Sequence, residues 1–156
     1  MKKEIIILIS ILIILLIGYL SVKFFVKNEN TNFVKVDLSG TNLIEAPNYI
    51  FSQKNIQELD LSDNNMTGSL PAEIRNLKSL KILNISHNQF TGLPAEVGQL
   101  KNLEVLNISY NNLTGLPNEI GNLRKLKTLD ISGNHCSETD LMAIEDKLPN
   151  LVIIDK

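Results

Sequence analysis

The chain of 156 residues contains no tryptophan, one cysteine, two histidines and only 5% aromatic residues. A single cysteine cannot form a disulfide within the chain. A zinc site needs clustered cysteine, histidine or carboxylate ligands, so this composition predicts no metal centre. The formal net charge is −2, and the chain therefore lacks the excess of positive charge that contacts with phosphate groups require. We expect neither a metal-binding nor a nucleic-acid-binding protein.

Catalytic motifs are also missing. His87 and His135 stand at different phases of the sequence pattern described below, and neither has a thiol or carboxylate at metal-ligand spacing. The sequence shows no Ser–His–Asp arrangement, no glycine-rich phosphate loop and no pair of acid–base carboxylates. Cys136 occupies a position that is apolar elsewhere in the pattern, so we expect a buried, inert thiol. We predict that the protein is not an enzyme and takes no cofactor.

A pattern of about 23 residues recurs through most of the chain. Its central copy reads LEVLNISYNNLTGLPNEIGN over residues 103–122, where Leu103, Leu106 and Ile108 precede Asn111 at fixed spacing. Copies begin near residues 33, 56, 80, 103 and 126, and the second holds one extra residue at Ser69. A period in this range predicts a solenoid, in which each turn is too small to fold alone and is stabilised by stacking.

These residues resemble the leucine-rich repeat family, in the version whose second half reads LPxxIGxL. The resemblance covers residues 33–156 and implies an α/β solenoid with a curved parallel β-sheet on its concave face. It also implies one inward-pointing asparagine in each regular turn: Asn64, Asn88, Asn111 and Asn134. The first copy departs from the pattern, with Thr41 in place of this asparagine and Ala46 in place of a leucine, as terminal repeats commonly do.

Residues 137–156 are predicted to close the solenoid as a C-terminal cap. Ser137 to Asp140 read as a helix start with a reciprocal side-chain cap, Pro149 as the stop of that helix, and residues 151–154 as a final strand. The disulfide-bonded caps found in animal and plant extracellular relatives are absent, and this absence is typical of bacterial or cytosolic members.

The first 32 residues are predicted to be a membrane anchor and its linker. Residues 1–4 form a charged tail, and residues 5–22 carry no charge over about 27 Å of helix, close to the thickness of the hydrocarbon core. Extended by Phe24, Phe25 and Val26, the predicted transmembrane signal anchor covers residues 5–26, and a polar linker follows at 27–32. A cleaved signal peptide is the alternative, although the apolar run is long and no small-x-small pair precedes a cleavage point.

The numbers of positive charges on the two sides of this anchor are nearly equal, so they do not determine its orientation. Lys2 and Lys3 stand before the span, and Lys23, Lys27 and Lys35 follow it. The very short leading tail and the long folded domain favour a single-pass protein whose repeat domain is extracytoplasmic.

The exposed positions of the predicted strands form columns across the sheet. One column is uniformly Asp or Asn and the next is serine, so we interpret both as features of the repeat itself. The first comprises Asp37, Asp60, Asn84, Asn107, Asp130 and Asp155. Two further columns vary: Lys35, Glu58, Ile82, Val105 and Thr128 in one, and Gly40, Asp63, His87, Tyr110 and Gly133 in the other.

At the centre of these variable columns, aliphatic and aromatic side chains have a polar rim, which is the composition of a protein-binding patch. We predict that a protein or peptide binds there, at Glu58, Asp60, Asp63, Ile82, His87, Val105 and Tyr110. The simpler interpretation is that Ile and Val suit strands. Two other roles stay open: a scaffold that faces the cytoplasm, and a structural envelope spacer without a dedicated ligand.

Overall fold

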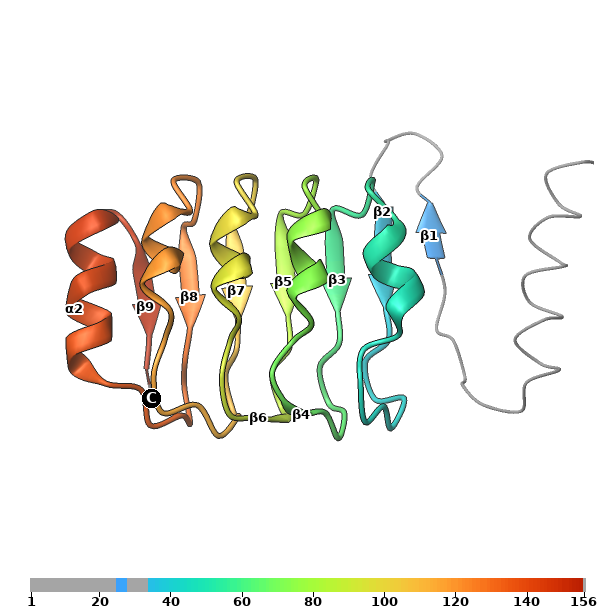
Figure 1. Cartoon of the computed structure of the whole chain (residues 1–156), viewed down its shortest axis with the longest axis horizontal. Helices are drawn as coiled ribbons and strands as arrows, with labels where there is room; N and C mark the ends of the chain where they lie inside the picture. Colours follow the sequence, from blue (N-terminus) through green and yellow to red (C-terminus); the bar gives the residue numbers. More distant parts are fainter. Residues whose placement is uncertain (1–24, 28–33, 156) are drawn as a thin grey trace, which may run out of the picture.

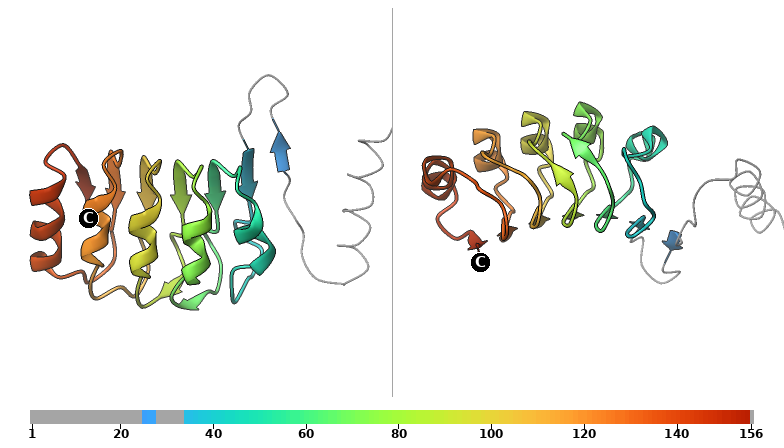
Figure 2. Two further views of the ribbon diagram at one scale, coloured as in Figure 1. Left: turned by 45° about the horizontal axis from the view of Figure 1, so that its top comes forward. Right: turned by 90° about the horizontal axis from the view of Figure 1, so that it is seen from below.

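The computed structural model describes residues 25–27 and 34–155. In this part of the chain, short strands lie side by side along a curved ribbon, and helical segments cover its outer, convex side (Figures 1 and 2). The main sheet has the strand order β1-β2-β3-β5-β7-β8-β9. Its strands are β1 (Phe25–Lys27), β2 (Val34–Asp37), β3 (Glu58–Asp60), β5 (Ile82–Asn84), β7 (Val105–Asn107), β8 (Thr128–Asp130) and β9 (Val152–Ile154).

From β2 to β9 every neighbouring pair of strands is parallel, and equivalent residues of successive repeats face each other. Leu59 pairs with Leu83, Leu83 with Leu106, and Leu106 with Leu129. These leucines are fully buried because alternate residues of a strand point to opposite faces of the sheet. The predicted curved parallel sheet on the concave face is confirmed.

Strand β1 runs antiparallel to β2 and pairs Phe25 with Val36. It covers an edge of the sheet whose backbone groups would otherwise lack partners. The prediction placed Phe25 and Val26 at the end of the membrane anchor and Lys27 in the linker, and the structure instead has all three in a strand. The remainder of the predicted anchor and linker lies outside the described residues, and none of the described helices has the length and apolar character needed to cross a membrane.

The inward-pointing asparagines tie each turn to the one before it. The Asn111 amide donates to the carbonyls of Ile85, Ile108 and Ser109 at 3.0–3.2 Å and accepts a hydrogen bond from the Phe90 N–H at 3.0 Å. The other three make equivalent bonds: Asn64, Asn88 and Asn134. Their predicted structural role is confirmed. In the first turn the Thr41 hydroxyl donates to the Leu38 carbonyl at 2.7 Å instead.

The convex side is built mainly from one-turn 3-10 helices. They are η1 (Asn48–Ser52), η2 (Ala72–Asn76), η3 (Ala95–Gln99) and η4 (Asn118–Asn122), each preceded by a proline. Proline suits this place because its fixed φ starts a helix and its missing N–H is not needed there. Gly98 allows neighbouring turns to approach, since a Cβ there would overlap the Glu119 carbonyl of the next turn. A second sheet joins β4 (Thr67–Gly68) to β6 (Gln89–Phe90).

The C-terminal cap consists of helix α2 (Glu138–Lys147) and strand β9. The helix ends before Pro149, and β9 pairs in parallel with β8, as predicted. The predicted reciprocal cap is wrong, because the Ser137 side chain makes no capping hydrogen bond. The Asp140 carboxylate instead accepts a hydrogen bond from the Leu116 N–H at 3.0 Å, so it holds the cap helix against the preceding turn.

Replacing Asn111 by Ala removes four hydrogen bonds and leaves buried backbone groups of two turns without partners. We expect the free energy of unfolding in urea to fall by about 2–4 kcal/mol, since each unsatisfied buried group costs roughly 1–3 kcal/mol. The matched control is Asn112→Ala, because Asn112 is exposed and bonds only through its backbone N–H to the Phe90 carbonyl. Equal losses for the two variants would contradict this account.

Candidate functional site

The structure brings the variable residues together on the concave face. Glu58, Ile82 and Val105 are direct neighbours on β3, β5 and β7. Lys35 on β2 precedes them in the row, and Thr128 on β8 and the exposed Val152 on β9 follow. Ile82 and Val105 are partly exposed. They place an aliphatic patch in the middle of the sheet.

The second variable row lies just beyond the ends of the strands and has an unusual backbone. Asp63, His87 and Tyr110 have φ between 52° and 56°, and Gly40 and Gly133 lie at 63° and 68°. From Gly40 to Tyr110, each N–H in the row donates to the serine carbonyl of the next turn, as Tyr110 does to Ser132 at 2.6 Å. The repeat therefore imposes a left-handed conformation on this row, and that conformation favours Gly, Asn or Asp over bulky residues.

His87 and Tyr110 occupy this row as a stacked pair. Their ring centroids are 4.5 Å apart and their planes differ by 14°. Tyr110 remains 52% exposed, and on its far side a Cβ at Gly133 would lie 2.7 Å from the ring. The two rings thus form a small ordered platform on the concave face, which the spacing of the sequence did not predict.

Two of the predicted site residues also have partners within the repeats. The Glu58 carboxylate pairs with the Lys35 ammonium at 2.8 Å, which raises the pKa of Lys35. Asp60 Oδ1 accepts hydrogen bonds from the Ser62 N–H at 3.0 Å and the Ser62 hydroxyl at 2.6 Å. Asp63 is exposed and has no ion-pair partner among residues 34–155.

The same Asp/Asn–Ser contact recurs at Asp37, Asn84, Asn107 and Asp130. This supports the interpretation of that column as a feature of the repeat. The sequence analysis placed Asp155 at its end, but Asp130 pairs with Ile154, so Asp155 lies one residue further on.

The sequence analysis missed a row of charged residues that directly precedes the strands: Lys81, Glu104 and Lys127. Lys127 forms an ion pair with Glu104 of the preceding turn, and this pairing lowers the pKa of Glu104. The identical position of the three residues in successive repeats was the available signal. The amino ends of the strands thus carry charges, and those of Glu104 and Lys127 neutralise each other.

Neither the Cys136 thiol nor the possible metal-binding side chains in the part of the chain that the structure describes have the features of a reactive site. Cys136 is half-buried against the core rather than fully buried as predicted. Burial, together with the charges of Asp155 and Asp140, raises the pKa of its thiol to about 11, which disfavours the reactive thiolate. Among the described residues, no cluster of His, Cys, Asp or Glu could hold a metal ion.

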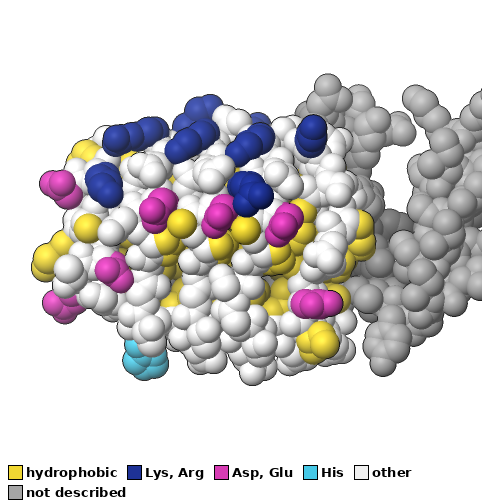
Figure 3. Space-filling view, in the orientation of Figure 1, with side chains coloured by type: hydrophobic (Ala, Val, Ile, Leu, Met, Phe, Trp, Pro, Cys, Tyr) yellow, Lys and Arg dark blue, Asp and Glu magenta, His cyan; other side chains and the backbone are white. Residues whose placement is uncertain are grey.

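The convex face has a different charge pattern. Lys and Arg side chains gather along the edge where the strands begin, and acidic residues lie in a row below them (Figure 3). Several of these cations bond to helix carbonyls: Lys101 Nζ donates to Gly98 at 2.7 Å, and an Arg124 guanidinium N–H donates to Lys147 at 2.7 Å. These cations stabilise the turns.

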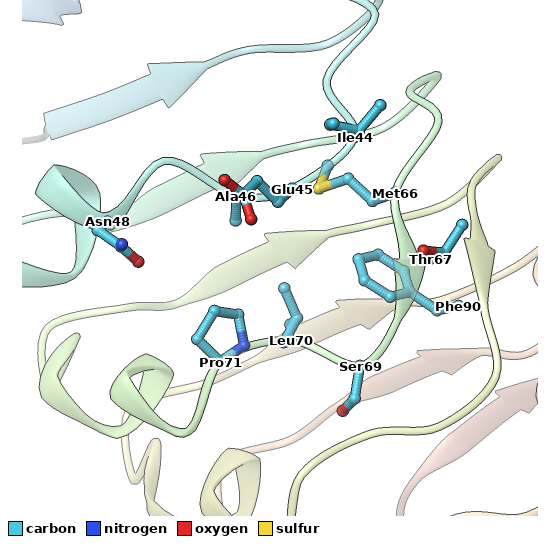
Figure 4. A pocket seen from close by; sticks show the side chains of 10 residues that line it. All are labelled: Ile44, Glu45, Ala46, Asn48, Met66, Thr67, Ser69, Leu70, Pro71 and Phe90. Atoms are coloured by element: carbon cyan, nitrogen blue, oxygen red, sulfur yellow. The ribbon is translucent and has the colours of Figure 1, made fainter.

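A hollow of about 260 Å³ with a mixed polar and apolar lining opens between the first two turns (Figure 4). Two departures from the repeat meet there, because both Ala46 and the extra residue Ser69 line it. The buried apolar side chains of Met66, Leu70 and Phe90 are part of its lining. The leucine that is missing at position 46 leaves this space unfilled.

Comparison with known proteins agrees with the architecture. A family model described as a leucine-rich repeat region matches residues 48–153. The chain belongs to the leucine-rich repeat family. Among curated relatives, the receptor-like protein CLAVATA2 of Arabidopsis thaliana is 44% identical over 63 residues, which cover 39% of this chain and 8% of that protein. This leucine-rich repeat chain spans less than a tenth of the length of the curated relatives it matches.

Solved leucine-rich repeat structures are similar over most of the chain. A leucine-rich repeat protein of Leptospira interrogans aligns with a TM-score of 0.64 and 32% identity, over 76% of this chain and 36% of that one. The BIR3–SERK2 complex of Arabidopsis thaliana gives a TM-score of 0.66 and 28% identity, over 83% and 71% of the two chains. The solenoid is thus shared by bacterial and plant proteins.

Replacing Ala46 by Leu restores the residue that the equivalent turns carry and fills part of the hollow. We expect the free energy of unfolding to rise by about 1 kcal/mol, because added apolar contacts fill existing space. The control is Ala95→Leu at an exposed helix position, where a change within about 0.5 kcal/mol is expected. A loss of stability at position 46 alone would show that the hollow cannot take a larger side chain.

Proposed function

We propose that this protein is a membrane-anchored leucine-rich repeat module that binds a protein or peptide on its concave sheet and has no enzymatic activity. The observation that carries the proposal is the exposed His87–Tyr110 stack beside the aliphatic pair Ile82 and Val105. Aromatic side chains are enriched in protein-binding patches. Glu58, Asp60 and Asp63 supply a polar rim on one side.

The backbone conformation supports this role for the stack. A bulky residue in the left-handed region costs about 1 kcal/mol relative to glycine, and the repeat accepts glycine at the same position in Gly40 and Gly133. Folding alone therefore does not require rings at His87 and Tyr110. A binding function gives a reason for keeping them.

The comparisons support the class of partner. The similar structures include the complex of BIR3 with SERK2 and that of PEPR1 with AtPEP1. We infer by analogy that the partner here is a protein or peptide, without assigning either of those partners to this chain. A scaffold that faces the cytoplasm and a spacer without a ligand are the competing roles.

The binding proposal is tested by selecting ligands from a random peptide library displayed on phage. Tyr110→Gly and His87→Gly should each weaken the selected ligands by roughly tenfold, because each removes half of the aromatic platform. Glycine is the appropriate substitution because it adopts the left-handed backbone without strain. Affinities measured for purified protein and synthetic peptides provide the comparison.

Tyr49→Gly is the matched control, since Tyr49 is 51% exposed on the convex side, close to the exposure of Tyr110. Its affinity for the selected peptides should match that of the unmodified protein. If Tyr110→Gly also binds as before, the concave stack is not a binding site, and the spacer role is favoured.

The membrane proposal places the uncharged run of residues 5–22 in the bilayer and the repeats outside the cytoplasm. Reporter proteins fused after Lys156 test this directly, one active only outside the cytoplasm and one active only inside. We expect the outside reporter to be active, because the charged tail before the span is only four residues long and the folded domain follows it. Activity of the inside reporter alone would favour the cytoplasmic scaffold.

A further inference from the structure

In the Asp/Asn column of the concave face, charged and neutral side chains make the same hydrogen bonds. Asp60 Oδ1 accepts from the Ser62 N–H at 3.0 Å and hydroxyl at 2.6 Å, and Asn84 Oδ1 accepts from the corresponding Ser86 groups at 3.1 and 2.8 Å. The turn therefore forms the same hydrogen bonds around an amide or a carboxylate. Where the column carries Asp, the negative charge is not needed for these hydrogen bonds to form.

These charges flank the aromatic platform. Asp60 and Asp63 lie on the side of the first turns, Asp130 lies on the side of the last ones, and Asn84 and Asn107 keep the centre neutral. Among the described residues, the rows that contain this column, the serines and the His87–Tyr110 stack hold no Lys or Arg. The concave face is consequently acidic at the carboxyl ends of its strands.

The amino ends of the strands differ, because the acids there are paired. Glu58 has Lys35 at 2.8 Å, and Glu104 has Lys127 as its ion-pair partner. Asp60, Asp63 and Asp130 form no ion pair with any residue of the described chain. Unpaired carboxylates beside exposed aromatic rings attract cationic groups, through Coulomb attraction and through the ring quadrupole.

We propose that the concave site takes an extended peptide segment with two basic side chains that flank an apolar or aromatic one. This inference rests on the proposed binding function and specifies its ligand. The basic groups lie against Asp60 with Asp63 at one end and against Asp130 at the other. The central side chain lies on the His87–Tyr110 platform.

The strand spacing sets the distance between the two basic residues. Three strand steps separate Asp60 from Asp130, and at about 4.8 Å per step they span about 14 Å. An extended peptide advances about 3.4 Å per residue, so four residues cover this distance. Residues i, i+2 and i+4 of an extended chain also point to the same side, which gives the order basic–x–apolar–x–basic.

The test uses synthetic peptides with the core Arg-Ser-Phe-Ser-Arg and the full-length protein in an uncharged detergent. Two peptides serve as comparisons: Glu-Ser-Phe-Ser-Glu, which reverses the charges, and Arg-Arg-Ser-Phe-Ser, which keeps the composition and loses the spacing. We expect the first peptide to bind roughly five- to tenfold more tightly than either comparison. The difference should shrink as the salt concentration rises.

The double variant Asp60→Asn with Asp130→Asn should lose this preference and keep its fold, because Asn is the native residue at two equivalent positions. The matched control is Glu73→Gln with Glu119→Gln, which removes two exposed charges from the convex helices. It should bind the arginine peptide as the unmodified protein does. Circular dichroism should show the same spectrum for all three proteins.

The two proposals can fail separately. Library-selected ligands that depend on Tyr110 and yet are acidic or uncharged would show that the ligand is not cationic. Ligands that bind the Asp60→Asn, Asp130→Asn protein unchanged would show the same, and either result leaves the proposed binding surface intact. If the arginine peptide does not bind the unmodified protein, the proposed ligand order is overturned. If Tyr110→Gly changes no binding at all, the binding surface itself is wrong.

Discussion

The hydrogen bonds of the buried asparagines are the constraint on which the rest of the structure depends. Each amide joins the backbone of its own turn to the backbone of the preceding one, so no turn satisfies its own polar groups. The solenoid must then be closed at both ends. A hydroxyl at Thr41 replaces the asparagine in the first turn, and Asp140 of helix α2 binds the Leu116 N–H in the last.

The same stacking determines where functional side chains can stand. In the first five turns the residue after the serine of each turn adopts the left-handed region, and in the first four its N–H donates to the serine carbonyl of the next turn. Glycine adopts this conformation at the lowest cost in free energy. His87 and Tyr110 depart from it at the centre of the sheet, and their stacking, worth about 0.5–1.5 kcal/mol, offsets part of the backbone cost.

Much of the fold was predictable because a fixed residue spacing determines which positions face each other. The sheet register from β2 to β8, the inward asparagines, the presence of a final strand and the proximity of Ile82 to Val105 all follow from that spacing, whereas the register of β9 differs from the prediction by one residue. The contacts that depend on individual side chains do not. The His87–Tyr110 stack, the Lys35–Glu58 pair and the use of Asp140 between turns arise from rotamers, and strand β1 arises from an edge that the repeat pattern does not describe.

In a repeat protein, different side chains occupy equivalent backbone positions of successive turns, so their roles can be compared directly. Asp and Asn make the same bonds in the column of the concave face, so the presence of charge at Asp60 and Asp130 is independent of folding. On the convex side, Lys101 and Arg124 are bound to helix carbonyls and serve the turns themselves. Asp60, Asp63 and Asp130 therefore carry charges without an ion pair to any described residue, on the same face as the aromatic platform, where a ligand of opposite charge is attracted to them.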